Sequence, residues 1–352
     1  KLYAVKLDAA DLNIFEVSLG HRDLKYEVDK AKEYLLTTLD KAYTPSDTLR
    51  LTVAYSASPE KGLYFIQPDD AYPKRPYQVW SQGEAEDNHY WFPCYDYPDD
   101  KATSEMIVTV NRKFSAISNG ALLDIKFDDA NNTKTFHWLE SKPHSSYLIS
   151  LVVGEYEQLK DEWNKIPVDY YVYKGQKKIA PLSFSNTPKM MQIFSDATGF
   201  NYPWEKYSQT IVSSFVYGGM ENVSATTLTD ETIHDERTHP DYHSDGLVAH
   251  ELAHQWFGDL ITCRNWSHAW LNEGFATFFG TYYYEANNEA DEAAYRWYTQ
   301  LQSIVSTDVG NRRRPTVTNR YFYPMDIFDG RIYAKGSVVL NMMRNILGDD
   351  SF

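Results

Sequence analysis

The sequence predicts an α+β fold in which a β-rich region comes first and a mainly helical region follows. Two observations support this prediction. Within the first 160 residues, short segments rich in β-branched and aromatic residues alternate polar and apolar positions with a period of two. From Ser244 onward, helical periodicity and helix-boundary residues dominate. We therefore expect a β-rich domain over residues 1–160 and a mainly helical domain over residues 161–352, with the polar stretch Glu157–Lys165 near the boundary.

Strands are expected where these segments are bounded by turn residues. Two turns, Ser118-Asn119-Gly120 and Asp128–Asn132, separate segments of the β-rich region. A continuous apolar run at its end is typical of a buried strand. The expected strands are Thr48–Ala57, Ser104–Phe114, Thr133–Glu140 and Tyr147–Tyr156.

Helix boundaries are marked by capping residues, proline and glycine. Thr187-Pro188 predicts a helix start, because proline is favoured at the first helical position, and Gly199 predicts its end. Ser244 or Asp245 is expected to cap the next helix, which should stop near Gly258. Two more helices are expected, over Leu271–Glu285 and Ala334–Leu347.

Composition excludes several classes of protein. The chain has 352 residues, of which 43% are hydrophobic, so it can bury sizeable cores. Its net charge of −15 argues against nucleic acid or anionic membrane as a main partner, because both require basic surfaces. No apolar run approaches the roughly 18–20 residues that span a bilayer. The two cysteines, Cys94 and Cys263, could form one disulfide, so the redox compartment stays undetermined. The sequence does not predict the oligomeric state either.

The strongest chemical signal is the pentapeptide His250-Glu251-Leu252-Ala253-His254. On a helix, residues four apart lie on one face, so His250 and His254 can reach a single metal ion. The alternative is a pair of surface histidines on an amphipathic helix. Glu273 follows His254 after a gap of 18 residues, which is enough for one helix to end and a second helix to present a carboxylate.

Two histidines and one glutamate form a ligand set that catalytic zinc uses, with one coordination position left open. We therefore expect one Zn²⁺ per chain, held by His250, His254 and Glu273. Glu251 lies beside the ligands on the helix rather than at the metal. It therefore suits a general base that accepts a proton from the attacking water.

Further motifs accompany the metal signature along the chain. In order, they are SQGEA (Ser81–Ala85), FPCYDYP (Phe92–Pro98), YGGMEN (Tyr217–Asn222) and YAKGS (Tyr333–Ser337). With these motifs the chain resembles the aminopeptidase N family of zinc metallopeptidases, the gluzincin aminopeptidases. The resemblance implies a curved, saddle-like β-rich domain followed by a thermolysin-like catalytic domain. It also implies peptide substrates with a free N-terminus.

The resemblance assigns the recognition of the substrate amine to carboxylates. Glu221 matches the family's main amine anchor, and Glu84 matches a second anchor position with Gln82 beside it. Carboxylates suit this role because they form charge-assisted hydrogen bonds with an ammonium group.

The rest of the YGGMEN motif is expected to lie along the bound peptide. Gly218 and Gly219 carry no Cβ and allow close approach of the backbone, while Met220 and Asn222 complete the substrate-binding segment. Tyr333 matches the family's transition-state residue, whose hydroxyl donates to the oxyanion of the tetrahedral intermediate.

Residues around the metal motif are expected to be structural. Trp256, Phe257, Trp266 and Trp270 should pack the two metal-bearing helices together, and His234, His239 and His243 should lie at the surface. Asn272 is expected either to support the metal ligands or to start the second helix.

Two alternative functions stay open. Most aminopeptidases of the family have alanine where this chain has Gly219, and the GGMEN form is typical of the leukotriene hydrolase branch. A bifunctional aminopeptidase and epoxide hydrolase is therefore an alternative. A non-catalytic scaffold homologue is a second alternative, although such proteins typically lose metal ligands or the general base.

Length adds one more expectation. Family members continue well beyond the catalytic tyrosine, whereas only a short segment follows Tyr333 here. The first residues already read as a strand. We therefore expect a fragment that lacks part of both ends of the family's architecture, with weaker activity than the whole protein. The preferred N-terminal residue of the substrate is not predicted.

Overall fold

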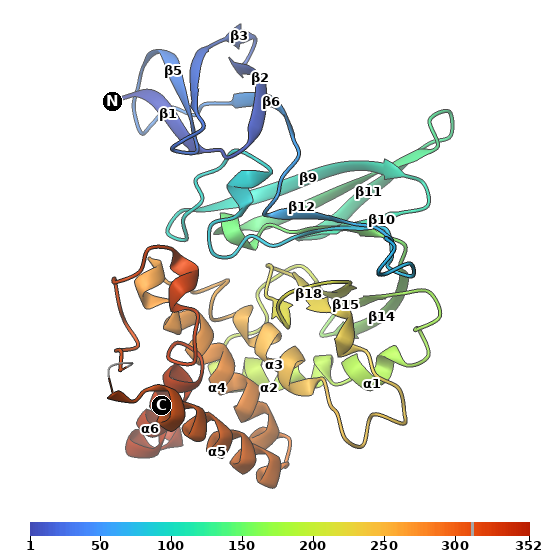
Figure 1. Cartoon of the computed structure of the whole chain (residues 1–352), viewed down its shortest axis with the longest axis vertical. Helices are drawn as coiled ribbons and strands as arrows, with labels where there is room; N and C mark the ends of the chain where they lie inside the picture. The colour runs from blue at the N-terminus through green and yellow to red at the C-terminus, as the bar shows by residue number, and fades with distance from the viewer. Residues whose placement is uncertain (311–312) are drawn as a thin grey trace.

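The computed structural model describes residues 1–310 and 313–352 and confirms the predicted α+β fold. A β-rich half stands above a mainly helical half, and the chain passes from the first to the second once (Figure 1). Within the described residues, no helix is both long and apolar enough to cross a bilayer. Cys94 and Cys263 are buried free thiols, so the disulfide left open by the sequence is absent.

The first sixty residues form two small antiparallel sheets. Their orders are β1-β5-β4 and β3-β2-β6. The strands are β1 Leu2–Asp8, β2 Leu12–Leu19, β3 Arg22–Asp23, β4 Lys25–Asp29, β5 Tyr34–Tyr43 and β6 Leu51–Ala57. A separate small core, which includes Leu12, Val17 and Leu35, lies between them.

Two further antiparallel sheets complete the β-rich half, in the orders β10-β13-β8-β7 and β11-β12-β9. The strands are β7 Leu63–Ile66, β8 Gln78–Ser81, β9 Lys101–Asn111, β10 Ser115–Ser118, β11 Ala121–Asp128, β12 Thr133–Ser145 and β13 Leu151–Gly154. Of the four expected strands, three coincide with β6, β9 and β12 within a few residues. The fourth is shorter than expected, because Ser146–Leu148 forms a 3₁₀ turn that places Tyr147 and Leu148 in the core.

A mixed five-stranded sheet, in the order β14-β15-β16-β18-β17, was not predicted. Its strands are β14 Glu157–Trp163, β15 Ile166–Val172, β16 Tyr207–Val212, β17 Gly219–Met220 and β18 Ala225–Thr229. Strand β16 runs parallel to β15 and β18, and it is buried along its whole length. Strands covered on both faces do not alternate in polarity, so period-two analysis misses them. The sheet begins before residue 160, and the domain division at 160/161 stays a prediction.

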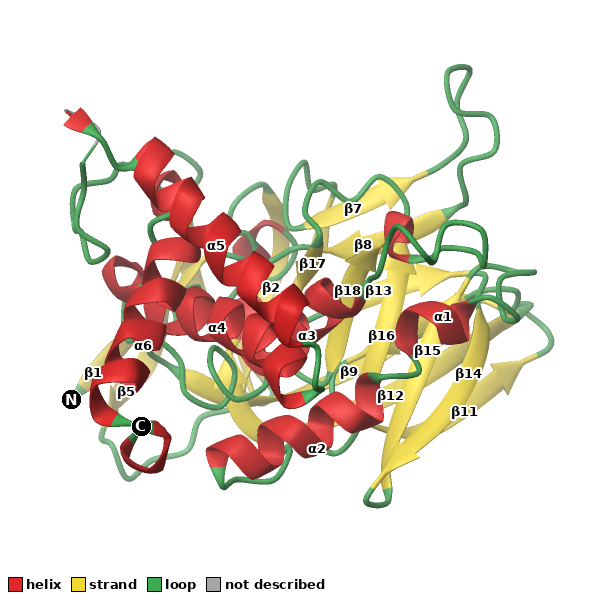
Figure 2. Cartoon of the chain, turned by 90° about the horizontal axis from the view of Figure 1, so that it is seen from below, coloured by secondary structure: helices red, strands yellow, loops and turns green. Residues whose placement is uncertain are grey.

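Six α-helices lie among the described residues. They are α1 Ala180–Phe184, α2 Thr187–Thr198, α3 Asp245–His254, α4 Trp270–Ala286, α5 Ala290–Thr307 and α6 Ala334–Leu347. Figure 2 shows α1 and α2 beside strands β14–β16, with α3, α4, α5 and α6 packed together next to them. Helix α2 ends at Gly199, whose φ of 66° is the left-handed conformation that glycine favours.

Two details of the helix predictions are corrected. Helix α3 ends at His254, four residues before Gly258. Ser244 precedes α3, but its side chain makes no capping hydrogen bond. Its hydroxyl instead donates to the carbonyl oxygen of Ser183. Helix α5 was not predicted individually.

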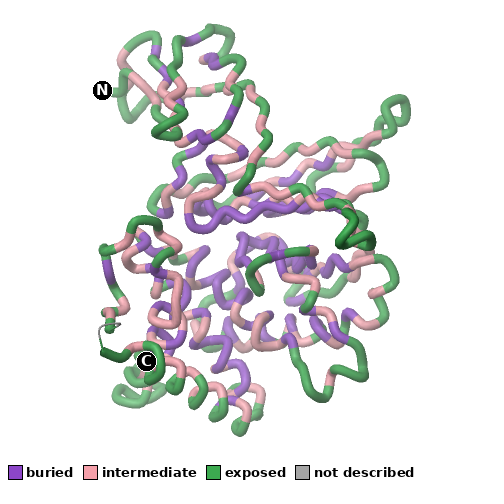
Figure 3. The backbone as a smooth tube through the Cα atoms, in the orientation of Figure 1, coloured by how far each residue is buried: buried purple, intermediate pink, exposed green. Residues whose placement is uncertain are grey.

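The main core continues from one half into the other. Figure 3 shows buried backbone in both halves. Trp80, Ile117 and Tyr147 of the β-rich half belong to the same buried cluster as residues of the helices. Since these side chains bury apolar area jointly, the two halves form one packed unit rather than independent bodies. The β-rich half can therefore supply one wall of a site whose other wall is helical.

A buried polar group also joins the halves. Glu140, in β12, accepts a hydrogen bond from the Ser224 hydroxyl over 3.2 Å. Burial, together with the neighbouring Glu205 carboxylate, raises the pKa of Glu140 to about 8. Lys206 lies nearby, and burial lowers its pKa to about 8.

Glu140 should make stability depend on pH. Its pKa rises from an ordinary 4.5 to about 8 on folding, so the folded state binds its proton more tightly. This contribution is complete below pH 4.5 and is lost as pH rises toward 8. We expect the free energy of unfolding to fall between pH 5.5 and 7.5 less steeply in Glu140→Gln than in the wild type. Urea denaturation at three pH values measures both slopes.

The matched control is Glu60→Gln, which changes an exposed carboxylate in the same half of the chain. Equal slopes in the wild type and Glu140→Gln would contradict this account of the buried carboxyl group.

Candidate active site

Helices α3 and α4 bring the three predicted metal ligands together. The Nε2 atoms of His250 and His254 lie 3.2 Å apart. The Oε2 atom of Glu273 lies 3.4 Å from His250 Nε2 and 3.2 Å from His254 Nε2. Three ligand atoms from two helices therefore form a nearly equilateral triangle.

The size of this triangle fits zinc. Tetrahedral zinc binds nitrogen and oxygen ligands at roughly 2.0–2.2 Å, which places pairs of ligand atoms roughly 3.3–3.5 Å apart. The ligand atoms of these three side chains are therefore close enough together to bind one metal ion. The donor set, two imidazoles and one carboxylate, is also one that zinc prefers.

Hydrogen bonds and neighbouring charges set the orientation of His254 and the ionisation of Glu273. His254 Nδ1 lies 3.0 Å from the Phe257 carbonyl oxygen, which can only accept, so Nδ1 donates to it and Nε2 is the nitrogen that faces the ligand triangle. Burial alone would raise the pKa of Glu273, but the two histidines lower it to about 2. Glu273 is therefore an ionised carboxylate.

Glu251 lies on α3 between the two histidines and lines the same cleft. Burial raises its pKa well above the usual range, and the negative charges of Glu221 and Glu273 add to this rise. Gly219 of β17 packs directly against it. A Cβ on Gly219 would overlap the Glu251 carboxylate carbon and Oε1, so glycine leaves the space that the carboxylate occupies.

Glu84 and Glu221 come from opposite halves of the molecule and meet at the cleft. Together with Glu273 they form a second group whose carboxylate oxygens lie within 4.8 Å of one another. One buried oxygen of each, Oε1, has no hydrogen-bond partner, and Gln82 Oε1 beside them has none either. Burial raises the pKa of Glu84 and of Glu221. Glu221 Oε1 also lies 3.8 Å from His254 Nδ1. Buried carboxylate oxygens that lack hydrogen bonds are stabilised by a cation that donates them.

The remaining residues of the YGGMEN motif fall into two groups. Gly218 and Gly219 line the cleft. Met220 and Asn222 are buried and are not among the residues that line it. The Met220 sulfur accepts a hydrogen bond from Gln82 Nε2 over 3.1 Å, and Asn222 Nδ2 donates to Thr227 Oγ1. Both side chains therefore support the motif through contacts within the protein. Their direct contact with substrate stays a prediction.

Tyr333 stands at the start of α6, and its hydroxyl donates to Glu273 Oε1 over 3.0 Å. Its ring centroid lies 6.1 Å from that of His250. The approach of α6 to α4 depends on two glycines in contact, because a Cβ on Gly336 would lie 3.0 Å from the Cα of Gly274. The hydroxyl is therefore held beside the ligand triangle.

The cleft has a volume of about 230 Å³ and includes residues that the sequence did not reveal. These are Leu247, Met325 and Phe328, whereas Tyr217, which also lines the cleft, belongs to the YGGMEN motif. Leu247 lies three residues before His250, so helical spacing could have placed it on the same face. Met325 belongs to the short 3₁₀ helix η6 (Pro324–Ile327) and Phe328 follows it, and no local pattern predicts that they reach the site.

The expectation that four aromatic residues pack the metal-bearing helices together is right only in part. Phe257 stacks on Phe275 of α4 with ring centroids 4.6 Å apart. Trp256 instead contacts Phe194 of α2, and Trp266 contacts Tyr147 of the β-rich half. These tryptophans join α3 and α4 to their surroundings rather than to each other.

Two polar expectations are also resolved. Asn272 donates to the Tyr147 hydroxyl and accepts from the Cys263 N–H, so it supports the loop between α3 and α4 rather than a ligand atom. His234 is buried, not at the surface, and its Nε2 lies 2.8 Å from His239 Nδ1.

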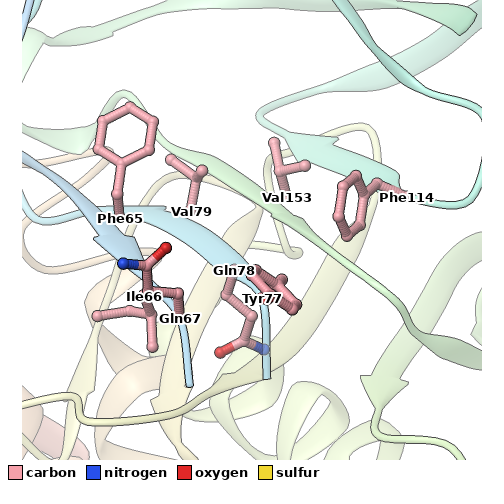
Figure 4. Close-up of a pocket in the computed structure, with 8 residues that line it drawn as sticks. All are labelled: Phe65, Ile66, Gln67, Tyr77, Gln78, Val79, Phe114 and Val153. Atoms are coloured by element: carbon pink, nitrogen blue, oxygen red, sulfur yellow. The ribbon is translucent and has the colours of Figure 1, made fainter. Parts of the chain in front are cut away.

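A different cavity lies on the β10-β13-β8-β7 sheet. Figure 4 shows its mainly apolar lining, which consists of Phe65, Ile66, Gln67, Tyr77, Gln78, Val79, Phe114 and Val153. None of these is a histidine, a cysteine or a carboxylate, so this cavity lacks the groups that the metal-bearing cleft combines.

Two family models match the chain in succession. Residues 1–148 match the peptidase M1 N-terminal domain, and residues 182–352 match the peptidase family M1 domain. A probable aminopeptidase 2 of Sulfurisphaera tokodaii is 27% identical over 99% of this chain and 44% of its own length. Aminopeptidase M1 of Arabidopsis thaliana is 30% identical over 77% of this chain and 32% of its own length. The chain thus spans less than half the length of these curated relatives.

A solved structure has the same fold. The M1 zinc metallopeptidase of Deinococcus radiodurans superimposes with a TM-score of 0.78 and 24% sequence identity, over 99% of this chain and 76% of that one.

The contact of Gly336 with Gly274 gives a prediction about stability. Gly336→Ala adds a methyl group against backbone that cannot move independently, so we expect a loss of about 1–3 kcal/mol in the free energy of unfolding. Gly330→Ala is the control, because its added Cβ would meet only the Ser303 hydroxyl at 3.6 Å. Equal stability of the two variants in chemical denaturation would contradict the close helix contact.

Proposed function

The chain belongs to the M1 peptidase family, and we propose that it is a zinc-dependent aminopeptidase, which removes the N-terminal residue from peptides. The observation that carries the proposal is the meeting, in one cleft, of the ligand triangle with buried carboxylate oxygens that lack hydrogen-bond donors. Relatives named as aminopeptidases support it. The Deinococcus radiodurans relative has been solved with a Tyr-Ser-Ala substrate, which supports a peptide as the ligand.

In this proposal His250, His254 and Glu273 hold one zinc ion per chain. When bound, zinc supplies a Lewis acid that polarises a carbonyl group and lowers the pKa of water. Phe257 orients His254 through its carbonyl oxygen, and Tyr333 orients Glu273 through its hydroxyl. Such support of the ligands typically raises metal affinity.

Glu221 and Glu84 bind the α-ammonium group of the peptide. The ammonium group brings three N–H donors and a positive charge to carboxylate oxygens that otherwise lack partners. An internal peptide bond has no such cation, so binding would leave these carboxylates unpaired. The cost of leaving them unpaired excludes internal cleavage.

Glu251 and Tyr333 act on the scissile bond. Glu251 accepts a proton from the attacking water and transfers it to the nitrogen of the leaving amine. When substrate is bound, the single Tyr333 O–H turns from Glu273 and donates to the oxygen that becomes negative as the carbonyl carbon turns tetrahedral. With Glu251 on α3 and Tyr333 on α6, the two groups approach the bond from different elements.

The two alternative functions gain no support of their own. Gly219 is the feature that suggested an epoxide hydrolase, and its space is filled by the Glu251 carboxylate. In this chain Gly219 therefore accommodates the Glu251 carboxylate, and it does not by itself indicate an epoxide substrate. The scaffold alternative requires loss of ligands or base, and this chain keeps His250, His254, Glu273 and Glu251.

Removing the base gives the first test of the proposal. Glu251→Gln keeps the shape of the side chain but cannot accept the proton, so we expect kcat for an aminoacyl anilide to fall by roughly 10²–10⁴-fold. Zinc content, measured by elemental mass spectrometry after dialysis, should stay unchanged. Near-normal turnover with full zinc content would refute this role of Glu251.

Filling the space beside the base gives a second test. Gly219→Ala should displace the Glu251 carboxylate and lower kcat by at least about tenfold, because small displacements of a reacting group are costly. Gly280→Ala is the control, since its added methyl would meet its neighbours at 3.5 Å or more. If Gly219→Ala turned over as fast as the control, this packing argument would fail.

A further inference from the structure

The turn between β17 and β18 carries the amine anchor and is completely enclosed. Residues 221–224 are all buried. The turn is closed by a hydrogen bond from the Ala225 N–H to the Asn222 carbonyl oxygen over 2.9 Å. Ser224 has a φ of 60°, a left-handed conformation that costs a residue with a side chain about 1–3 kcal/mol. Such a conformation persists only where neighbouring groups hold it.

The side-chain amide of Gln255 spans this turn. Its Nε2 donates to the Glu221 carbonyl oxygen over 2.8 Å. Its Oε1 accepts from the Ser224 N–H over 2.8 Å and from the Tyr202 hydroxyl over 3.2 Å. One planar amide therefore ties together the two ends of the segment that follows the anchor. Gln255 is fully buried and comes directly after the predicted metal ligand His254.

The β-rich half holds the same turn from the other side. Asn119 Nδ2 donates to the Val223 carbonyl oxygen over 2.7 Å. The Gly120 N–H donates to Ser224 Oγ over 2.7 Å. From the second half, Lys206 Nζ, directly before β16, also donates to the Ser224 carbonyl oxygen over 2.7 Å. The turn is thus anchored to the β-rich half through Asn119 and Gly120, and Gln255 joins it by hydrogen bonds to the end of the metal-bearing helix.

We propose that Gln255 is a positioning residue that sets the distance between the amine anchor Glu221 and the metal ligands. This inference rests on the proposed aminopeptidase function. A free amine bound at Glu221 brings the scissile carbonyl to the metal only if that distance is correct. Gln255 therefore contributes to affinity for ligands that engage both points at once, and little to affinity for ligands that engage the metal alone.

The test compares two ligands that differ only in the amine. L-leucine hydroxamate engages the metal and the anchor, whereas 4-methylpentanoyl hydroxamate, its des-amino analogue, engages the metal alone. We measure Kd for both by calorimetry on the full zinc-loaded chain. In Gln255→Leu we expect the Kd of leucine hydroxamate to rise roughly tenfold or more, because the hydrogen bonds on both sides of the turn are lost. The Kd of the analogue should change by less than about twofold, with zinc content unchanged.

Gln255→Glu keeps the experiment decisive if the leucine variant does not fold. This variant preserves shape and keeps Oε1 as the acceptor for Ser224, but it deletes the donor to the Glu221 carbonyl oxygen. We expect a smaller rise in the Kd of leucine hydroxamate than in Gln255→Leu, and no change in the Kd of the des-amino analogue. The control is Gln209→Leu, which removes another fully buried glutamine of the same half, hydrogen-bonded to Thr187, and should leave the ratio of the two Kd values unchanged.

Glu221→Ala separates this inference from the function on which it rests. If Glu221→Ala left the ratio of the two Kd values unchanged, the proposed amine anchor would fail. If Glu221→Ala abolished the preference for the amine but both Gln255 variants kept the wild-type ratio, only the positioning role would be overturned. An equal rise of both Kd values in the Gln255 variants would also overturn it, because it would indicate a general structural loss.

Discussion

The meeting of His250, His254 and Glu273 within 3.2–3.4 Å of one another is the constraint on which the rest of the site depends. Two helices must cross so that the end of α3 faces the beginning of α4. Phe257, just after α3, stacks on Phe275 of α4, and Asn272 holds the loop that connects the helices. Helix α6 then approaches α4 through the Gly274–Gly336 contact, which brings Tyr333 to Glu273. Each of these contacts helps to fix the positions of the three ligand atoms relative to one another.

The site also concentrates acidic side chains whose charge the neighbouring histidines balance only in part. Glu84, Glu221, Glu251 and Glu273 are all buried around one cleft, and buried charges without partners destabilise a fold. Burial raises the pKa of Glu84, Glu221 and Glu251, whereas the histidines hold Glu273 ionised. Two cations would balance these carboxylates: a metal ion at the ligand triangle, and the ammonium group of the substrate at Glu84 and Glu221. Charges arranged in this way are typical of functional sites, where a protein keeps features that its stability alone would not favour.

Local patterns predicted the parts of the site that depend on local spacing. The i, i+4 rule is sufficient for His250 and His254, and a second helix predicted from Leu271 is sufficient to bring a carboxylate such as Glu273 into reach. Glu84, Glu221 and Tyr333 followed only from resemblance, since a single glutamate or tyrosine carries no local signal. Strands β16 and β18, and the wall residues Met325 and Phe328, depend on tertiary packing and could not be predicted. Gln255 is the clearest case, because a glutamine after a histidine says nothing about the turn it spans.

If one zinc site and one amine site act together on the end of a peptide, cleavage requires both the metal and a free amino group. Both requirements can be measured by mass spectrometry of Tyr-Ser-Ala and of its N-acetyl derivative, incubated with the full zinc-loaded chain. We expect release of tyrosine from the free tripeptide alone, and loss of this release when a chelator removes the metal. Equal cleavage of the acetylated peptide, or cleavage that persists after the metal has been removed, would contradict it.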